Sequence, residues 1–432
     1  MKTIRFIAVT ALASLMCIGG LTSCHRSGND DEKQNVKSQQ EQKEYLESVA
    51  NELMDLVPAH EFKGITDFAK LQILTLPAFD WDSVGLWVEN VLKASVQPLD
   101  ASGMNYKYLL LASNFTGHFT ERIGLGEIGW DYKAADDLQF VYTDLMGNRV
   151  RMKLVTEGET VNVHIGDFTE YSLIGNHPME FNSRYEVGFP EKIAVSIECN
   201  DSTMLSTVFR FNLEGIEDTE FNLASSNLAF SAMVELINGY SIGIEQLAYK
   251  GNSNISLKVA LKKGNKDLVG VAAGTDFTGM PDYDISGFSQ GKDFDIDIQN
   301  VRISNTYVNV DVLGRIQLRG RVKDLTAILY CLENADRCNR NEAEFKSYIA
   351  NANSLMEVGL YYDNKTVKNA ELKFEPIKDG NSDIWYAVPV ICFEGGKTYV
   401  TVESFFSEIN FKDVIDRFNE WLESYKKLIL SI

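Results

Sequence analysis

The fold is decided by a stretch in the middle of the chain: ISLKVAL (255–261), the polar turn KKGNK (262–266) and LVGVAA (268–273). In the first run, apolar and polar residues alternate with a period of two, which is typical of a β-strand that buries one face. A glycine-containing turn of a few residues between two such runs predicts a β-hairpin. We therefore expect the centre of this chain to be a sheet.

Two more hairpins are predicted on either side of shorter turns. The run from Leu138 (LQFVY) is joined by a turn at 146–148 to a second alternating run, 149–155. KIAVSIEC (192–199) is joined to TVFRFNL (207–213) across Asn200 and Asp201. These intervals are too short for helical crossovers, so residues 106–322 are predicted to form a mostly antiparallel β-rich domain.

Helical periodicity marks both ends of the chain. Residues 43–105 are predicted to form a helical subdomain, with Asp82 or Ser83 capping its second helix. Its apolar stripes are Leu46, Val49, Leu53 and Leu56, then Val84, Trp87, Val88, Val91 and Leu92. A long amphipathic helix behind an Asn410 cap, with an aromatic stripe expected to pack along a sheet face, closes an α+β C-terminal region, 323–432. The predicted fold class is α+β.

The first 24 residues have the order of a secretory signal. Lys2 and Arg5 precede an apolar stretch, 6–18, and the segment ends in Leu21-Thr22-Ser23-Cys24. This ending resembles the lipobox of bacterial lipoproteins, which implies cleavage before Cys24 and acylation of its thiol, and so a protein anchored to a membrane by lipid. Residues 25–42 are polar and are predicted to be a flexible tether.

The residues after Cys24 resemble the leader of an outer-membrane lipoprotein of Gram-negative bacteria. His25 stands where an aspartate would resemble an inner-membrane retention signal, and the acidic run 30–32 resembles a surface-export tag. The resemblance implies an outer-membrane, cell-surface location; the alternative for the acidic run is a solvated linker. The body resembles uncharacterised α+β lipoproteins, without a motif that identifies one family.

The charge balance argues against nucleic-acid partners. The chain carries 41 lysines and arginines against 61 acidic residues, a net charge of -20. Such a surface repels polyanions unless basic residues gather locally, and no basic run is visible in the sequence.

Catalytic and metal motifs are incomplete. GFSQG (287–291) matches the G-x-S-x-G of serine hydrolases, but the alternating KDFDIDI that follows Ser289 predicts a strand where the motif needs a helix. The last histidine is His177, so no later base follows Ser289. HEFKG, from His60, lacks the second histidine of a zinc helix. We expect a turn at Ser289 and no catalytic residue, metal ion or cofactor.

Four cysteines beyond the leader leave one disulfide open. Cys331 and Cys338 lie seven residues apart. One continuous helix through both would hold their Cα atoms about 10.5 Å apart, too far for a disulfide, whereas a helix that ended near Asn334 would allow one. Ser202 and Ser83 lie in Asp-Ser-Thr and Asp-Ser-Val, which resemble an O-glycosylation motif; a turn and a helix cap explain the same residues.

Three functions remain open at this stage. The first is a non-catalytic surface lipoprotein that binds a ligand, such as a glycan, or an outer-membrane protein partner. Aromatic residues make up 11% of the chain, which permits sugar-stacking surfaces. The second is a hydrolase with a carboxylate pair, which leaves no spacing signature. The third is an amphiphile carrier with a groove along Phe418 and Leu422.

Overall fold

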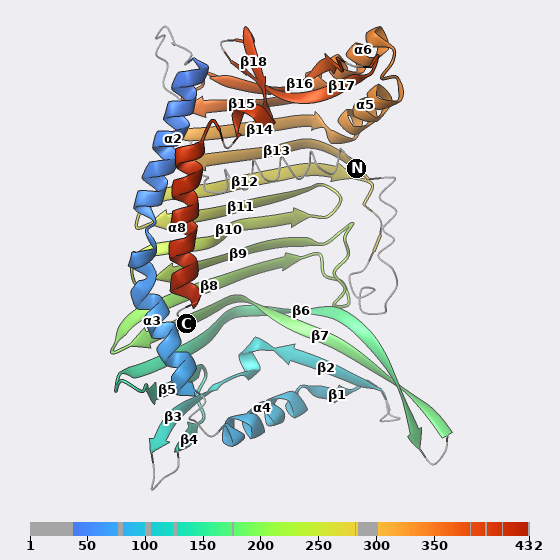
Figure 1. Ribbon diagram of the computed structural model, residues 1–432. Helices are drawn as coiled ribbons and strands as arrows, with labels where there is room; N and C mark the ends of the chain where they lie inside the picture. The colour runs from blue at the N-terminus through green and yellow to red at the C-terminus, as the bar shows by residue number, and fades with distance from the viewer. Residues whose placement is uncertain are drawn as a thin grey trace.

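The computed structural model describes residues 38–76, 81–99, 105–123, 128–174, 177–280, 282–283, 301–380, 382–393, 395–407 and 409–430. Most of this chain forms one open sheet of 18 strands (Figure 1). Its pairs are antiparallel except β2 with β7 and β3 with β5. The described part is therefore sheet-dominated, with helices at the N-terminal side and at the C-terminal end.

The strands from β7 to β18 follow one another through the sheet, and β6 pairs with β7 along its length. The strands are β1 (Val96–Pro98), β2 (Tyr106–Leu111), β3 (Gly117–Ile123), β4 (Ile128–Lys133), β5 (Leu138–Thr143), β6 (Arg149–Ile174), β7 (His177–Cys199), β8 (Ser202–Glu214), β9 (Asn227–Leu236), β10 (Tyr240–Lys250), β11 (Asn254–Lys263), β12 (Lys266–Thr278), β13 (Arg302–Val312), β14 (Ile316–Asp324), β15 (Met356–Tyr362), β16 (Ala370–Lys378), β17 (Trp385–Phe393) and β18 (Thr398–Thr401). The helices are α2 (Gln39–Leu56), η1 (Ala59–Phe62), α3 (Lys63–Thr75), α4 (Asp82–Ala94), η3 (Ala112–Asn114), α5 (Leu325–Arg337), α6 (Glu342–Ser354), α7 (Val402–Phe405) and α8 (Lys412–Leu430).

The three predicted hairpins are confirmed. Strands β11 and β12 pair with Leu261 opposite Val269 and Leu257 opposite Ala273. Strands β5 and β6, and β7 and β8, also pair as antiparallel neighbours. The two-residue turn between β7 and β8 has positive φ at Asn200 (48°) and Asp201 (61°), the left-handed conformation that matches the twist of a tight hairpin.

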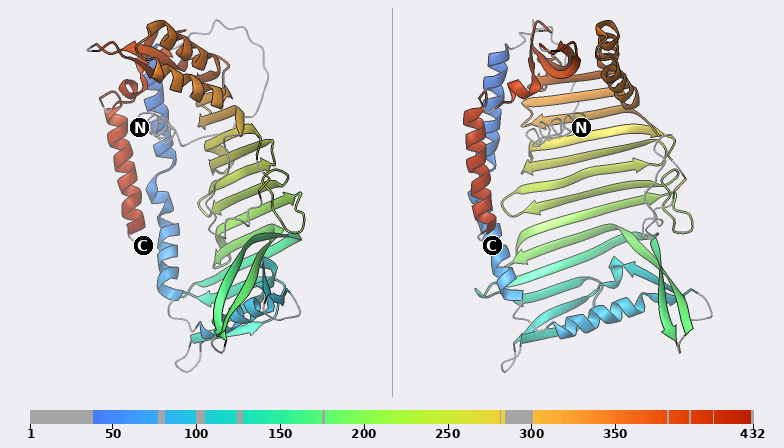
Figure 2. Two further views of the ribbon diagram at one scale, coloured as in Figure 1. Left: turned by 90° about the vertical axis from the view of Figure 1, so that its right-hand side faces the viewer. Right: turned by 45° about the vertical axis from the view of Figure 1, so that its right-hand side comes forward.

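The sheet has two unlike faces because side chains alternate along each strand. One face carries apolar side chains that align across strands, such as Leu261, Val269 and Val312. The helices α2, α3 and α8 lie over one end of the strands on this side (Figure 2), so we name it the helix face. The opposite surface, the polar face, carries residues such as Lys258, Asn309 and Arg319.

Helix α2 and η1 pack on hairpin turns at one end of the strands. Val57 lies in a buried cluster with Tyr240 of β10 and Leu268 of β12. The Tyr240 hydroxyl donates a hydrogen bond to the carbonyl of Leu56 at 2.5 Å. Farther along α2, Val49 packs against Ile316 and Tyr362. One helical segment thus holds strands from β10 to β15.

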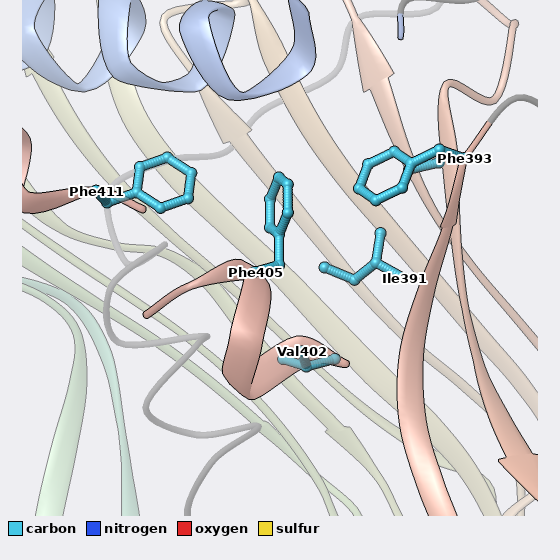
Figure 3. Close-up of a cluster of buried hydrophobic side chains, with 6 residues drawn as sticks. Ile391, Phe393, Val402, Phe405 and Phe411 are labelled. Atoms are coloured by element: carbon cyan, nitrogen blue, oxygen red, sulfur yellow. The ribbon is translucent and has the colours of Figure 1, made fainter. Parts of the chain in front are cut away.

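The other helices pack near the two edges of the sheet. Val84 of α4 joins Phe119, Trp130 and Tyr142 beneath strands β3 to β6. Helices α5 and α6 connect β14 to β15 and pack against β16 and β17, where Phe345 meets Phe374. At the start of α8, Phe411 packs with Phe405 of α7 and Phe393 of β17 in the buried cluster that Figure 3 shows.

The C-terminal helix does not pack along the sheet as expected. Its aromatic side chains turn toward α2 and η1: Trp421 and Tyr425 both donate hydrogen bonds to the carbonyl of Val57, at 2.7 and 2.8 Å. Phe418 stacks on Trp421 and remains 41% exposed. The position next to the sheet is already taken by α2 and η1, so α8 forms an outer layer.

Two predicted helix caps and one helix boundary also differ. Helix α4 begins after Trp81 without a side-chain cap, so neither Asp82 nor Ser83 caps it from outside. The Asn410 amide donates to the carbonyls of Ser404 and Phe405, which ties it to α7. Helix α2 begins at Gln39, within the segment predicted as tether, with a capping box from Ser38.

Candidate functional site

A hollow on the polar face lies across β13, β14 and β15. Its volume is about 360 Å³, and its lining consists of Tyr307, Asn309, Arg319, Gly320, Arg321, Glu357 and Tyr361. The strand register explains the grouping. Tyr307 stands opposite Arg321, and Arg321 stands opposite Glu357. Two residues along the same strands, Asn309 stands opposite Arg319.

Small residues on the neighbouring strands leave room for the side chains around the hollow. The neighbouring strand β12 presents Gly270, Ala272 and Gly274 beside Asp311, Asn309 and Tyr307. A Cβ atom on Gly274 would lie 2.7 Å from Tyr307 Cε1, so the tyrosine ring lies across β12, directly over the glycine. Gly359 of β15 is covered in the same way by the stem of Lys368. The two glycines therefore leave room for the Tyr307 ring and the Lys368 stem.

The other tyrosine of the hollow stacks on an arginine. The guanidinium carbon of Arg319 lies 4.4 Å from the centroid of the Tyr361 ring. Such cation–π stacking holds the planar group parallel to the ring and leaves its N–H edges available. Across the hollow, Glu357 pairs with Lys368 at 3.2 Å, and Lys368 also contacts Glu371 at 2.8 Å. The hollow thus combines two aromatic rings with the hydrogen-bond donors of Arg319, Arg321 and Asn309.

This combination suits binding better than hydrolysis. Glycoside hydrolysis needs two carboxyl groups, about 5 to 9.5 Å apart, on either side of the bond. Glu357 is the single acid among the seven lining residues, and Lys368 holds it as an ion pair. The volume lies near the lower end of the range of about 300–1,000 Å³ for small-ligand sites. The hollow can hold a small polar ligand, but it lacks a carboxylate pair.

Polar residues also gather where β2 meets the long β6–β7 hairpin. Glu186, 2% exposed, lies 2.5 Å from Lys107 Nζ and 3.0 Å from Arg184 Nε. The Thr219 side chain accepts a hydrogen bond from Arg184 at 2.8 Å, and Thr219 has a φ of 69°. The ion pairs balance the buried carboxylate, so this cluster serves to fasten the turn at 217–220 to the hairpin.

None of the predicted site residues that the structure describes lines the hollow. Cys24 and Ser289 fall outside the described residues. The thiols of Cys331 and Cys338 are free, and helix α5 continues to Arg337, so the helix does not end near Asn334. Ser202 is exposed at the start of β8, and Ser83 is exposed in the first turn of α4. Phe418 and Leu422 do not line the hollow.

Sequence reasoning missed the hollow itself. The runs TYVNVDV (306–312) and IQLRGRV (316–322) alternate, so their polar side chains were visible as one face of each strand. Strand β15, which supplies Tyr361 and Glu357, follows only after α5 and α6. Its place beside β14 is a tertiary fact that periodicity does not reveal.

Across the described ranges, no three or more histidine, cysteine or acidic side chains come together to hold a metal ion. Within the same ranges, no helix has the length and apolar character needed to cross a membrane. Comparisons with protein family models, with curated proteins and with solved structures found no match to this chain.

Proposed function

We propose that this protein is a non-catalytic surface lipoprotein that captures a saccharide in the hollow on β13 to β15. The observation that carries the proposal is the arrangement of Tyr307 and Tyr361 beside Arg319, Arg321 and Asn309 around one open depression. Sugar rings offer apolar C–H faces and many hydroxyl groups, which aromatic rings and planar donors match. Anchoring through Cys24 at the outer membrane, facing outward, would place this hollow where external glycans arrive.

Saccharide binding is tested by isothermal titration of the detergent-solubilised, full-length protein against a panel of neutral and acidic oligosaccharides. Tyr361→Ala and Tyr307→Ala should each weaken binding about tenfold, which corresponds to about 1.4 kcal/mol. Tyr399→Ala is the matched control, because Tyr399 is an exposed tyrosine on β18, outside the hollow. If no member of the panel binds with a Kd below about 1 mM, the proposal fails.

Anchoring is tested separately from binding. Cys24→Ala should abolish acylation and move the protein out of the membrane fraction, because the acyl chains supply about 0.8 kcal/mol per buried CH₂. Protease treatment of intact cells should cleave the wild-type protein if it faces outward. A Cys24→Ala protein that remains in the membrane fraction would contradict lipid anchoring.

One observation favours a second candidate, an amphiphile carrier. On the helix face, several apolar side chains are partly exposed: Ile242 (52%), Ile255 (37%) and Val308 (39%). Exposed apolar surface on a sheet can receive acyl chains. Displacement of a fluorescent fatty acid tests this candidate, and Val308→Asp should abolish the signal while Tyr361→Ala leaves it intact. Saturable fatty-acid binding that Val308→Asp leaves unchanged would exclude this face.

A further inference from the structure

Neither arginine of the hollow forms a close ion pair with a described residue. In the part of the chain that the structure describes, neither Arg319 nor Arg321 has an acidic oxygen within 4 Å or a hydrogen bond of its own. Several other arginines among the described residues do form ion pairs. The pairs include Arg151 with Glu198 at 2.7 Å, Arg184 with Glu186 at 3.0 Å, Arg417 with Asp55 at 2.5 Å and Arg315 with Glu52. The hollow therefore presents two guanidinium groups that have no close ion-pair partner in the described part of the chain.

The acidic residues near these arginines have other interaction partners. Glu357, opposite Arg321 in the register, is held by Lys368 at 3.2 Å. Asp311, farther along β13, is nearly buried and accepts the Gly314 N–H at 2.7 Å, inside the turn between β13 and β14. Burial is the largest effect on Asp311 and raises the pKa of its carboxyl group, although the charge of Arg319 acts in the opposite direction, so Asp311 offsets the charge of Arg319 only in part.

The geometry of the pair suits an oxyanion. Arg319 and Arg321 are two residues apart on β14, so they project from the same face about 6.5 to 7 Å apart along the strand. Each guanidinium presents N–H groups in a planar fork, which matches the paired oxygens of a carboxylate or a sulfate. Stacking on Tyr361 fixes the orientation of Arg319 before any ligand arrives.

The net charge of the whole chain makes such a local site selective. With a net charge of -20, the protein repels polyanions at long range. An acidic ligand gains binding free energy only where its charged group contacts Arg319 and Arg321. A ligand with one oxyanion near the stacked ring satisfies this condition better than a dense polyanion does.

We infer that the captured saccharide carries an oxyanion, either the carboxylate of a uronic acid or a sulfate ester, which Arg319 and Arg321 bind while the sugar ring lies against the tyrosines. This inference rests on the proposed saccharide function and narrows its ligand class. The uronic acid and the sulfate ester share the same recognition chemistry, so paired probes distinguish them.

The test compares acidic sugars with their neutral counterparts by isothermal titration of the full-length protein in detergent. One pair is trigalacturonic acid and its methyl ester; the other is a sulfated galactose disaccharide and its unsulfated form. In at least one pair, the acidic member should bind tenfold or more tightly than the neutral one. Arg321→Gln should remove that preference, and Arg319→Lys should reduce it, because lysine keeps the charge and loses the fork.

Arg210→Gln is the matched control, since Arg210 is an exposed arginine on β8, outside the hollow. It should leave the preference unchanged, and unaltered thermal midpoints would show that all variants are folded. Equal affinity for both members of each pair would overturn this inference and leave saccharide capture standing. Binding of none of the four probes would contradict this inference, and the proposed function would fail as well only if the wider saccharide panel also showed no binding. Inorganic sulfate that binds as tightly as the sulfated sugar would reduce the site to an ion site.

Discussion

Asp137, just before β5, has three partners around its carboxylate. His118 Nε2 lies 2.5 Å from one oxygen, while Gln139 and Lys153 contact the other at 2.9 and 3.1 Å. Partial burial alone would raise the pKa of this carboxyl group, but the three hydrogen bonds outweigh burial and lower the pKa to about 2. The charged form of Asp137 thus stabilises the folded state.

This network predicts a specific pH dependence. A carboxyl group whose folded pKa lies below its unfolded value stabilises the protein above the unfolded value, about 4, and loses that effect as the pH falls toward 2. We expect Asp137→Asn to lower the free energy of unfolding at pH 7 by on the order of 1 kcal/mol, allowing for solvent screening. Urea titrations at pH 7, 4 and 2.5 check this, because the difference between variant and wild type should shrink only between the last two.

At the scale of elements, the position of α8 is set largely by hydrogen bonds to one backbone carbonyl. The carbonyl of Val57, where α2 ends, accepts hydrogen bonds from both Trp421 and Tyr425, and Phe62 of η1 lies 5.7 Å from the Tyr425 ring. Arg417 adds contacts to Asn51 and Asp55 on α2. The docking of α8 is therefore concentrated on one side of the helix.

We expect Trp421→Ala to loosen α8 without unfolding the sheet. The change removes a hydrogen bond and a half-buried ring, a loss of about 2 kcal/mol. Hydrogen exchange should show reduced protection in α8, while protection in β10 to β14 should remain. Phe418→Ala, on the exposed part of the same helix, is the control and should have little effect. Equal loss of protection in the strands would show that α8 is part of the sheet's folding unit.

At the scale of the whole molecule, a single layer of strands has little enclosed core of its own. The buried clusters lie where helices meet the sheet, at α4, at α5 with α6, and along α2. Gln42 of α2 is fully buried: its amide donates to the carbonyl of Asn369 at 2.8 Å and accepts from the Tyr362 hydroxyl at 2.9 Å. Helix α2 thus ties the strands of one half of the sheet together.

Loss of the Gln42 hydrogen bonds should destabilise strands β15 and β16, which are far from Gln42 in the sequence. Gln42→Ala leaves the Tyr362 hydroxyl and the Asn369 carbonyl without these buried partners, which should cost about 2 to 5 kcal/mol in the free energy of unfolding. Chemical denaturation measures the total, and hydrogen exchange should locate lost protection in β15 and β16. Gln40→Ala, on the exposed side of the same helix, should change stability by less than about 0.5 kcal/mol. Equal effects of the two substitutions would contradict the role of α2.

The sequence by itself determined the local structure: the hairpins at 144–148, 200–201 and 264–265, the helices α2, α4 and α8, and the predominance of antiparallel strands. These features follow from periodicity and turn residues, which act over a few residues. It missed α3, whose apolar residues are spread around the helix, and it misplaced α8. The surface on which a helix packs depends on which other elements already cover the sheet, and the local sequence pattern of the helix does not predict this.

The tertiary structure alone decided the site. Tyr307, Arg319 and Tyr361 each occupy an ordinary outward position in an alternating strand, and nothing in their own strands distinguishes them. They become neighbours because β15 returns beside β14 after two helices, and they surround a hollow because Gly274 and Gly359 leave room for other side chains. Strand order and the space between side chains arise only when the sheet is assembled, so the chain's chemistry could be read only from its fold.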